Sequence, residues 1–300
     1  MKLFRNILTG LLAAVFAVSS LLALDLALDY RAEQERHADA LALASGTGPH
    51  DPPPLPEITE PAPLPANILL PQTPPATEPE PAEPLPTEPT GPAPIFDLHA
   101  PWLEDLDLEA LREVNADVVG WILIPGTRIS YPIVQGADND YYLNHTWDGQ
   151  QNAAGAVFLE ASHAADFSDF STILYGHNLR SGAMFTDLHR YKAQDFWQDH
   201  PFVYIATDTG CSRYRIYAAY EADVTGPTYW QSVPAELQRE YVDYGLTHST
   251  VETGVIPDDG APVLTLSTCT GYTYARRWVV QAVLEGPITG APAIIPFGNQ

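Results

Sequence analysis

The sequence predicts a mostly β fold, an antiparallel barrel or sandwich, preceded by a hydrophobic N-terminal segment and a proline-rich stretch. After residue 115 the chain consists of short β-branched and aromatic runs separated by turn residues, a pattern typical of such folds. Helical stretches are short and do not alternate regularly with these runs, which disfavours a parallel α/β fold. Proline marks the domain boundary, because 17 of the 29 prolines lie between Pro52 and Pro94. We therefore expect one globular domain over residues 101–300.

The N-terminal segment from Ile7 to Leu24 contains no charged residue. Its 18 residues would form a helix of about 27 Å, close to the roughly 30 Å of a bilayer's hydrocarbon core. Basic residues precede this segment and acidic residues follow it, so we expect the short N-terminus in the cytoplasm and the rest of the chain outside. Residues 1–30 are predicted to form an uncleaved signal anchor that crosses the membrane once. A cleaved signal peptide is the alternative.

Residues 31–100 are predicted to lie outside the cell as a helical stretch followed by a stalk. Helical spacing over residues 25–50 favours a continuation of the N-terminal helix. Between residues 51 and 94 the density of proline excludes helix and strand pairing and favours polyproline II, which the glutamates keep solvated. A spacer between membrane and globular domain is the preferred interpretation, and a docking ligand for a small module is the alternative.

The globular domain shows helix and strand patterns in a clear order. Trp102–Asn115 has apolar residues at mostly helical spacing and acidic residues at its start, which suit the helix dipole. Eight strands are predicted: Val119–Ile124, Ile129–Val134, Gly155–Leu159, Thr172–Tyr175, Phe202–Ala206, Arg213–Tyr220, Val263–Thr268 and Trp278–Leu284. Short helices are predicted between some of them: Asn139–Asn144, Phe185–Tyr191 and Glu236–Leu246.

Charge and cysteine content exclude several classes of protein. The net charge is −24, with −9 before and −15 after residue 100, so no basic face is expected that could bind a nucleic acid. Two cysteines are too few for a zinc ribbon or a disulfide-dense scaffold. The acidic residues do not form a calcium loop of the EF-hand type. We expect neither a metal ion nor an organic cofactor.

Two segments carry residue types that packing alone does not require. The strand-like run TILYGHN contains His177, the apolar run TLSTCT contains Cys269, and Arg277 follows eight residues later. A thiol acts as a nucleophile near neutral pH only beside a base or a positive charge. His177 could transfer the proton and Arg277 could stabilise an oxyanion. The residues alone also allow an inert Cys269, a disulfide between Cys211 and Cys269, a structural turn histidine and a surface arginine.

From about Val114 to Gly286 the chain resembles the class B sortases, membrane-anchored cysteine transpeptidases of Gram-positive bacteria. The resemblance includes the family's TLxTC signature within a set of stretches that occur in the right order. These stretches are Asn115–Ile122, Tyr131–Gln135, Asp138–His145, Tyr175–Asn178 with Met184, Phe185 and Leu188 downstream, Thr265–Thr270, and Arg277–Val280. The resemblance implies an eight-stranded sortase-type β-barrel with an N-terminal helix. It also implies that the helix at Glu236–Leu246 lies in the loop before the catalytic strand, beside the substrate groove.

The resemblance implies a role for each matching residue. Cys269 would be the nucleophile, His177 the general acid and base, and Arg277 the group that holds the substrate or its oxyanion. Arg276 is adjacent and is the alternative, since neighbouring strand residues face opposite sides and only one can point into the site. Arg277 is preferred because the family places its arginine directly before the apolar strand residues, as RWVV does here. The residues expected to contact the substrate are Thr268, Ser267 and Asn178. No carboxylate completes a triad in these segments, so a strongly activated thiolate is not expected.

The reaction implied by the resemblance has two halves. Cys269 attacks the carbonyl of a threonine in a C-terminal sorting motif of a secreted protein, and an acyl-enzyme thioester remains. An amine of a peptidoglycan precursor then takes the acyl group, with no cofactor required. A pilin polymerase that uses a lysine side chain is the nearest alternative; a hydrolytic protease and a non-catalytic surface protein are more distant ones. The implied location is the Gram-positive cell surface, with the catalytic domain outside the membrane.

Overall fold

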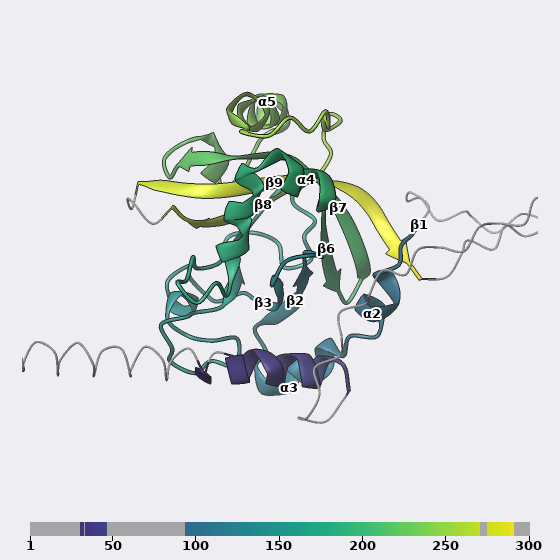
Figure 1. Cartoon of the computed structure of the whole chain (residues 1–300), viewed down its shortest axis with the longest axis vertical. Coiled ribbons are helices and arrows are strands. Elements are labelled where there is room, and N and C mark those ends of the chain that lie inside the picture. The colour runs from purple at the N-terminus through teal and green to yellow at the C-terminus, as the bar shows by residue number, and fades with distance from the viewer. Residues whose placement is uncertain (1–30, 33, 47–93, 271–274, 291–300) are drawn as a thin grey trace, which may run out of the picture.

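A computed structural model describes residues 31–32, 34–46, 94–270 and 275–290, and the predicted anchor (residues 1–30) and most of the proline-rich stretch lie outside these residues (Figure 1). Eight strands in the described residues close into a barrel, in the order β9-β7-β6-β2-β3-β4-β5-β8, with β8 pairing back to β9. They are β2 Val118–Leu123, β3 Ser130–Val134, β4 Val157–Leu159, β5 Ser171–Tyr175, β6 Phe202–Thr207, β7 Gly210–Asp223, β8 Val263–Cys269 and β9 Arg276–Thr289. The predicted eight-stranded barrel is therefore confirmed.

Most pairs of neighbouring strands are antiparallel, as the sequence predicts, but three are parallel. These are β3 with β4, β5 with β8, and the short strand β1 (Ile95–Phe96) with the end of β9. Strand β1 is not predicted, because two residues are too short to show a period. The parallel pairing of β5 with β8 matters most, because it places the ends of the two predicted catalytic segments side by side.

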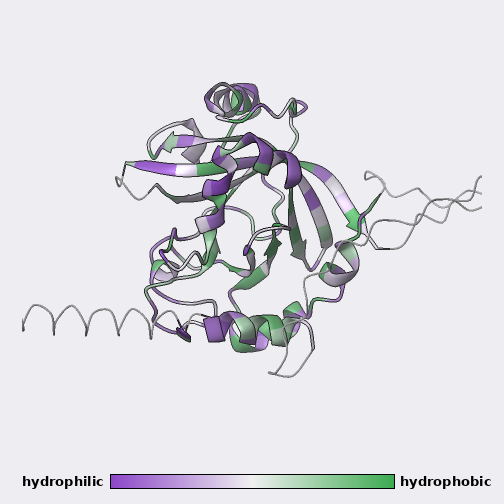
Figure 2. Cartoon of the chain, in the orientation of Figure 1, coloured by the Kyte–Doolittle hydropathy of each residue, from purple (hydrophilic) through white to green (hydrophobic). Residues whose placement is uncertain are grey.

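Alternation along the strands separates the inside of the barrel from its outside, and the strand ribbons change between hydrophobic and hydrophilic residues along their length (Figure 2). Leu264 and Leu266 of β8 pack in the interior cluster together with Trp278 and Val280 of β9. Val263, one position out of phase with the two leucines, packs in a second cluster outside the barrel. The same alternation decides which way the residues at the end of β8 face.

One outer face of the barrel is covered by α2 (Ala100–Glu104) and α3 (Leu108–Val114). The sequence predicts a single helix over Trp102–Asn115, and this prediction is wrong. The Asp107 carboxylate accepts the N–H of Ala110 and caps α3, so a new helix begins there. Asp107 also donates its own backbone N–H to the carbonyl of Ala44, at 2.7 Å.

The opposite outer face is covered by α5 (Gln238–His248) and the single turn η4 (Ala235–Leu237) before it (Figure 1). They form the helix predicted at Glu236–Leu246. Beneath α5 lies a buried polar network. Gln281 of β9 accepts hydrogen bonds from Tyr217 and Tyr220, at 2.9 and 3.1 Å, and donates to Tyr241 and Thr265, at 3.2 and 3.1 Å. Because each partner is satisfied, the network holds α5 in one orientation against β7, β8 and β9.

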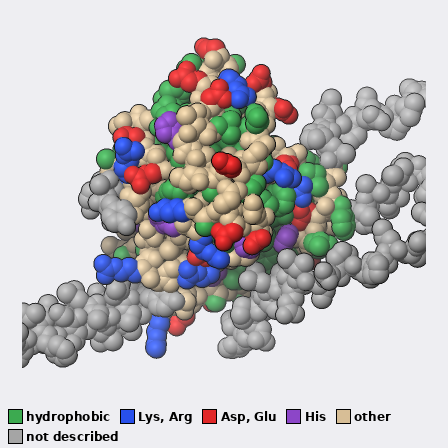
Figure 3. Space-filling model, turned by 45° about the horizontal axis from the view of Figure 1, so that its top comes forward, with side chains coloured by type: hydrophobic (Ala, Val, Ile, Leu, Met, Phe, Trp, Pro, Cys, Tyr) green, Lys and Arg blue, Asp and Glu red, His purple; other side chains and the backbone are tan. Residues whose placement is uncertain are grey.

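Shorter elements complete the described chain. They are the single turns η1 (Tyr141–Leu143) and η3 (Pro227–Tyr229), the longer 3₁₀ segment η2 (Phe185–Lys192), and helix α4 (Gln194–Asp199). Acidic and basic side chains are interspersed over the face seen in Figure 3. Nowhere in the described ranges is a helix both long and apolar enough to cross a membrane.

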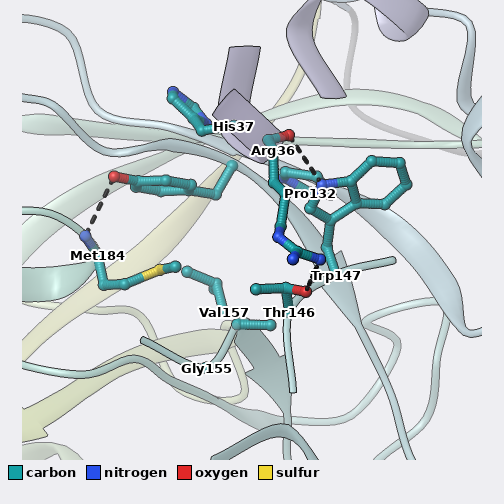
Figure 4. Close-up of a pocket in the computed structure, with 10 residues that line it drawn as sticks. Arg36, His37, Pro132, Thr146, Trp147, Gly155, Val157 and Met184 are labelled. Atoms are coloured by element: carbon teal, nitrogen blue, oxygen red, sulfur yellow. Dashed lines mark hydrogen bonds between the residues drawn. The ribbon is translucent and has the colours of Figure 1, made fainter. Parts of the chain in front are cut away.

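A helix that includes residues 34–44 packs on the barrel ahead of the proline-rich stretch (Figures 1 and 4). The indole N–H of Trp147 donates to the Arg36 carbonyl at 3.1 Å, and the Arg36 guanidinium forms an ion pair with Asp148 at 3.2 Å. His37 lies against the ring of Tyr131, with centroids 4.5 Å apart. Burial lowers the pKa of His37 to about 4, so this contact contains a neutral imidazole near neutral pH.

Candidate active site

The three predicted catalytic residues come from three neighbouring strands. Cys269 is the last residue of β8, and its antiparallel partner is Arg277 of β9. Tyr175, the last residue of β5, pairs with Ser267, so His177 and Cys269 each lie two residues beyond that pair. Residues directly opposite each other in an antiparallel pair project from the same face. The strand register therefore brings the thiol, the imidazole and one guanidinium to one end of the sheet.

A side-chain hydrogen bond joins His177 and Cys269, and it shifts the pKa of both groups. The bond to His177 lowers the pKa of the Cys269 thiol, partial burial opposes this shift, and the charge of Arg277 adds to it. The same bond raises the pKa of His177. The two shifts have opposite signs, and both favour a thiolate beside an imidazolium.

A backbone carbonyl orients His177. Its Nε2 lies 2.7 Å from the Leu143 carbonyl oxygen, which accepts the hydrogen bond. This carbonyl occupies the place that a carboxylate takes in a catalytic triad. The sequence could not reveal it, because a backbone oxygen in a turn has no side-chain signature.

The geometry distinguishes the two adjacent arginines. Arg277 pairs with Cys269 and is half-buried, whereas Arg276 is exposed and pairs with Asp223 of β7. The charge of Arg276 contributes to the lowered pKa of Asp223, for which hydrogen bonds from Thr225 are the main cause. Because neighbouring residues of a strand face opposite sides, Arg277 is the arginine on the thiol's face.

The three residues expected to contact the substrate have different surroundings. Ser267 lies on the same face of β8 as Cys269, and its hydroxyl is hydrogen-bonded to that of Tyr229 at 2.8 Å. Thr268 lies on the opposite face, in phase with the interior leucines of β8. Its hydroxyl is buried and has no hydrogen-bond partner among the described residues. The side-chain amide of Asn178 donates to the Cys269 carbonyl at 3.0 Å, so it is already engaged within the protein.

His163, in the 161–170 loop, connects two parts of the fold. Its Nδ1 accepts the N–H of Ile173 at 3.2 Å, and its Nε2 donates to the carbonyl of Gln231 at 3.1 Å. This buried histidine therefore ties the loop to the segment that leads into α5. In the ranges that the structure describes, no cluster of histidine, cysteine and carboxylate side chains has the arrangement of a metal site.

The second cysteine, Cys211, does not pair with Cys269 in the structure, where both thiols are free. Cys211 is buried in the outer cluster beneath α2 and α3. Burial raises the pKa of its thiol to about 11, which makes it inert near neutral pH. Cys269, with its lowered pKa, is therefore the reactive thiol of the two.

Comparison with known proteins agrees with this geometry. The sortase domain family matches residues 122–285. The sortase B of Listeria monocytogenes is 37% identical over 186 residues, covering 59% of this chain and 74% of that protein. A Staphylococcus aureus sortase B–substrate complex has a TM-score of 0.56 at 27% identity, covering 60% of this chain and 84% of that one. A sortase B complexed with triglycine has a TM-score of 0.56 at 26% identity, covering 59% and 85%. The chain therefore belongs to the sortase family, in its class B, and is a cysteine transpeptidase.

Proposed function

We propose that this protein cleaves a C-terminal sorting motif of secreted proteins after a threonine and transfers the acyl group to an amine of the cell wall. The observation that carries the proposal is that Cys269 and its strand partner Arg277 lie beside His177, which follows the end of the neighbouring strand β5. The S. aureus structure contains a substrate, and the other sortase B contains triglycine, a short peptide with a free amine. Both fit a reaction that joins a peptide to an amine.

In the first half of the proposed reaction, the Cys269 thiolate attacks the threonine carbonyl and forms a tetrahedral oxyanion. The Arg277 guanidinium, permanently charged, stabilises this oxyanion. As the peptide bond breaks, the His177 imidazolium gives its proton to the leaving amine, and a thioester remains on Cys269. In the second half, neutral His177 accepts a proton from the incoming amine, which attacks the thioester and releases the thiolate.

Ser267 and the residues around it are proposed to line the groove in which the peptide binds. Ser267 and Tyr229 lie on the thiol's side of β8, beneath the segment that leads into α5. The proposal assigns Thr268 a contact only through its backbone, because its side chain faces the barrel interior. Asn178 is assigned no contact with the peptide, because its side-chain amide donates to the Cys269 carbonyl.

The proposed location is the outer face of the membrane of a Gram-positive cell. Residues 1–30 would anchor the chain, with the short N-terminus in the cytoplasm. Residues 31–100 would lie outside the membrane together with the catalytic domain, residues 101–300. Both assignments rest on the hydrophobic segment and the charges that flank it.

A mass-spectrometric assay tests the proposed reaction. Residues 31–300 are incubated with a library of sorting-motif peptides and with three acceptors: triglycine, a peptidoglycan stem peptide and a peptide with an internal lysine. We expect a thioester adduct on Cys269 and a product joined to a glycine or stem-peptide amine.

Two variants serve as the matched pair for this assay. Cys269→Ala removes adduct and product, whereas Cys211→Ala, at the buried cysteine, retains both. If only the lysine peptide gave a joined product, the protein would be a pilin polymerase instead. If the thioester reacted only with water, it would be a protease. An active Cys269→Ala variant would refute the thioester mechanism.

A further inference from the structure

The carbonyl group of the nucleophile itself has two side-chain partners. The side-chain amide of Asn178 and Nε2 of His189 each lie 3.0 Å from the Cys269 carbonyl oxygen, and 3.0 Å from each other. A carbonyl oxygen has two lone pairs and accepts both hydrogen bonds when His189 carries its proton on Nε2. In that tautomer the Asn178 amide and Nε2 are two donors that share the carbonyl oxygen, and no hydrogen bond joins them to each other. Both residues thus converge on one atom of the reactive residue without touching its sulfur.

The strand register explains why this carbonyl needs side-chain partners. The N–H of Gly176 donates to the Ser267 carbonyl at 3.1 Å, the last rung between β5 and β8. Continued by two residues, the same parallel pattern would bring the backbone N–H of Asn178 to the Cys269 carbonyl. The chain instead turns away after Gly176, and Asn178 pairs with Met184. Its side-chain amide takes the place of the missing rung.

His189 is itself firmly placed. It lies on η2, and its ring stacks on that of Trp278 with centroids 6.0 Å apart and an interplanar angle of 25°. Trp278 is fixed in turn, because its indole N–H donates to the Leu188 carbonyl at 2.8 Å. Burial lowers the pKa of His189, which keeps the ring neutral near neutral pH. The imidazole is therefore a rigid, uncharged donor aimed at the end of β8.

We propose that Asn178 and His189 are a positioning pair that holds the Cys269 carbonyl and so directs the thiol toward His177. The carbonyl carbon is bonded to the Cys269 Cα, so a peptide plane that cannot rotate also fixes where the Cβ–Sγ bond starts. β5 ends before it can donate a backbone hydrogen bond to the Cys269 carbonyl, and the two side-chain hydrogen bonds replace that missing bond. Neither residue contacts the reacting atoms, so both act through Cys269.

Variants at His189 test the pair. His189→Leu removes the donor, and His189→Gln keeps an N–H donor near the place of Nε2. With a fluorogenic peptide chosen from the library above, we expect His189→Leu to lower kcat about tenfold, or about 1.4 kcal/mol, with KM unchanged. His189→Gln should restore most of the loss. His200→Leu, the same change at a half-buried histidine on the C-terminal side of α4, serves as the control and retains kcat.

Asn178 supplies a second arm of the test. Asn178→Ala should also lower kcat about tenfold. Because the two donors share one acceptor, combining Asn178→Ala with His189→Leu should lower kcat by more than the product of the two single effects, that is, by over 100-fold. If Asn178 instead binds substrate, as the resemblance to the family implies, the alanine variant raises KM and shows no coupling with His189.

A readout without substrate separates this inference from the proposed function, on which the kcat arm rests. In a Cys211→Ala background, the alkylation rate of Cys269 by iodoacetamide is measured against pH. We expect His189→Leu to move the midpoint upward, because a less well placed thiol loses its hydrogen bond to His177, and His189→Gln to restore it. An unchanged alkylation profile, or a Gln variant as impaired as Leu, would overturn the positioning role. A shifted profile in a chain that joins no peptide to any amine would refute the proposed function alone.

Discussion

A methyl group at Gly155 tests whether the placement of His177 decides the activity. Gly155 precedes β4 with a φ of +64°, and a Cβ atom there would lie 2.9 Å from His177 Cδ2 and 3.0 Å from the Leu143 carbonyl oxygen. The Tyr142 carbonyl oxygen would be closer still, at 2.7 Å. Since ordinary contacts begin at 3.4 Å, the imidazole and the carbonyl that holds it must each move by about half an ångström. Gly155→Ala therefore strains the backbone and displaces His177, the proposed general acid and base.

Gly149→Ala separates these two effects. Gly149 has a φ of +76°, but a Cβ atom there would meet only the Tyr141 hydroxyl, at 3.7 Å. A left-handed backbone costs an alanine about 1–2 kcal/mol, so both variants should melt lower by about 2–8 °C. Displacement by 1 Å can cost an enzyme about 100-fold in rate, so we expect Gly155→Ala to lose about 10- to 100-fold in kcat/KM. Gly149→Ala should stay within about twofold of the parent.

Peptide cleavage kinetics and thermal melting of the parent and both variants provide the measurement. The alkylation profile of Cys269 should also shift upward in Gly155→Ala, because its hydrogen bond to His177 weakens. Activity of Gly155→Ala within twofold of the parent would show that the site tolerates a displaced imidazole. An equal loss in Gly149→Ala would attribute the effect to backbone strain alone.

The pKa shifts and the orphaned hydroxyl lead to three further predictions. Because the hydrogen bond to His177 lowers the pKa of Cys269, iodoacetamide should alkylate the thiol half-maximally below its ordinary pKa of 9, and His177→Ala should move this midpoint upward. Thr268→Val should raise stability by about 1 kcal/mol and leave kcat/KM within about twofold, since it removes a buried hydroxyl that has no hydrogen-bond partner in the part of the chain that the structure describes. The pKa of His37 is about 4 when residues 34–44 are docked and near 6.5 when they are not. As the pH falls between these two values, the undocked imidazole is protonated while the docked one stays neutral, and this favours the undocked state. The free energy that favours docking of residues 34–44 should therefore fall by about 2 kcal/mol at pH 5. Faster hydrogen exchange of the backbone amides in these residues would show the loss.

Each of these predictions has its own control. A midpoint unchanged by His177→Ala would mean that burial or Arg277 alone sets the thiol's reactivity. A Thr268→Val variant with strongly reduced kcat/KM would place the hydroxyl in the substrate's path. His37→Leu, which cannot titrate, should make the exchange of residues 34–44 independent of pH between 7 and 5 once intrinsic rates are corrected. The same dependence in both proteins would exclude His37 as its cause.

The barrel could be predicted from the sequence because its strands have a period of two and turn residues separate them. All eight predicted strands occur, with ends that differ by a few residues. The break between α2 and α3 was missed because the cap formed by Asp107 depends on one side chain within an otherwise helical pattern. The choice of Arg277 over Arg276 rests on the resemblance, because alternation shows only that one of the two faces the site, and the register with Cys269 agrees with the choice.

Alternation also predicts the orientation of Thr268, which is adjacent to Cys269 and therefore lies on the other face of β8. The contacts of His177 with Leu143, and of Cys269 with His189, could not have been predicted in this way. They join residues 34 and 80 positions apart through a backbone oxygen, and only the closed barrel brings them together. The sequence thus indicates which side chains react, whereas the groups that orient them become visible only in three dimensions.

The consecutive order β5, β8 and β9 makes the pairing at the end of β8 independent of the loops around it. The pairing of Cys269 with Arg277 follows from the hydrogen-bond ladder between β8 and β9, which holds neighbouring strands about 4.8 Å apart regardless of the sequences of the loops. The loops that lead to η3 and α5 contribute no rung between these strands. Changes in their length or composition can therefore alter the surface beside Ser267 and Tyr229, while the register that pairs Cys269 with Arg277 stays the same.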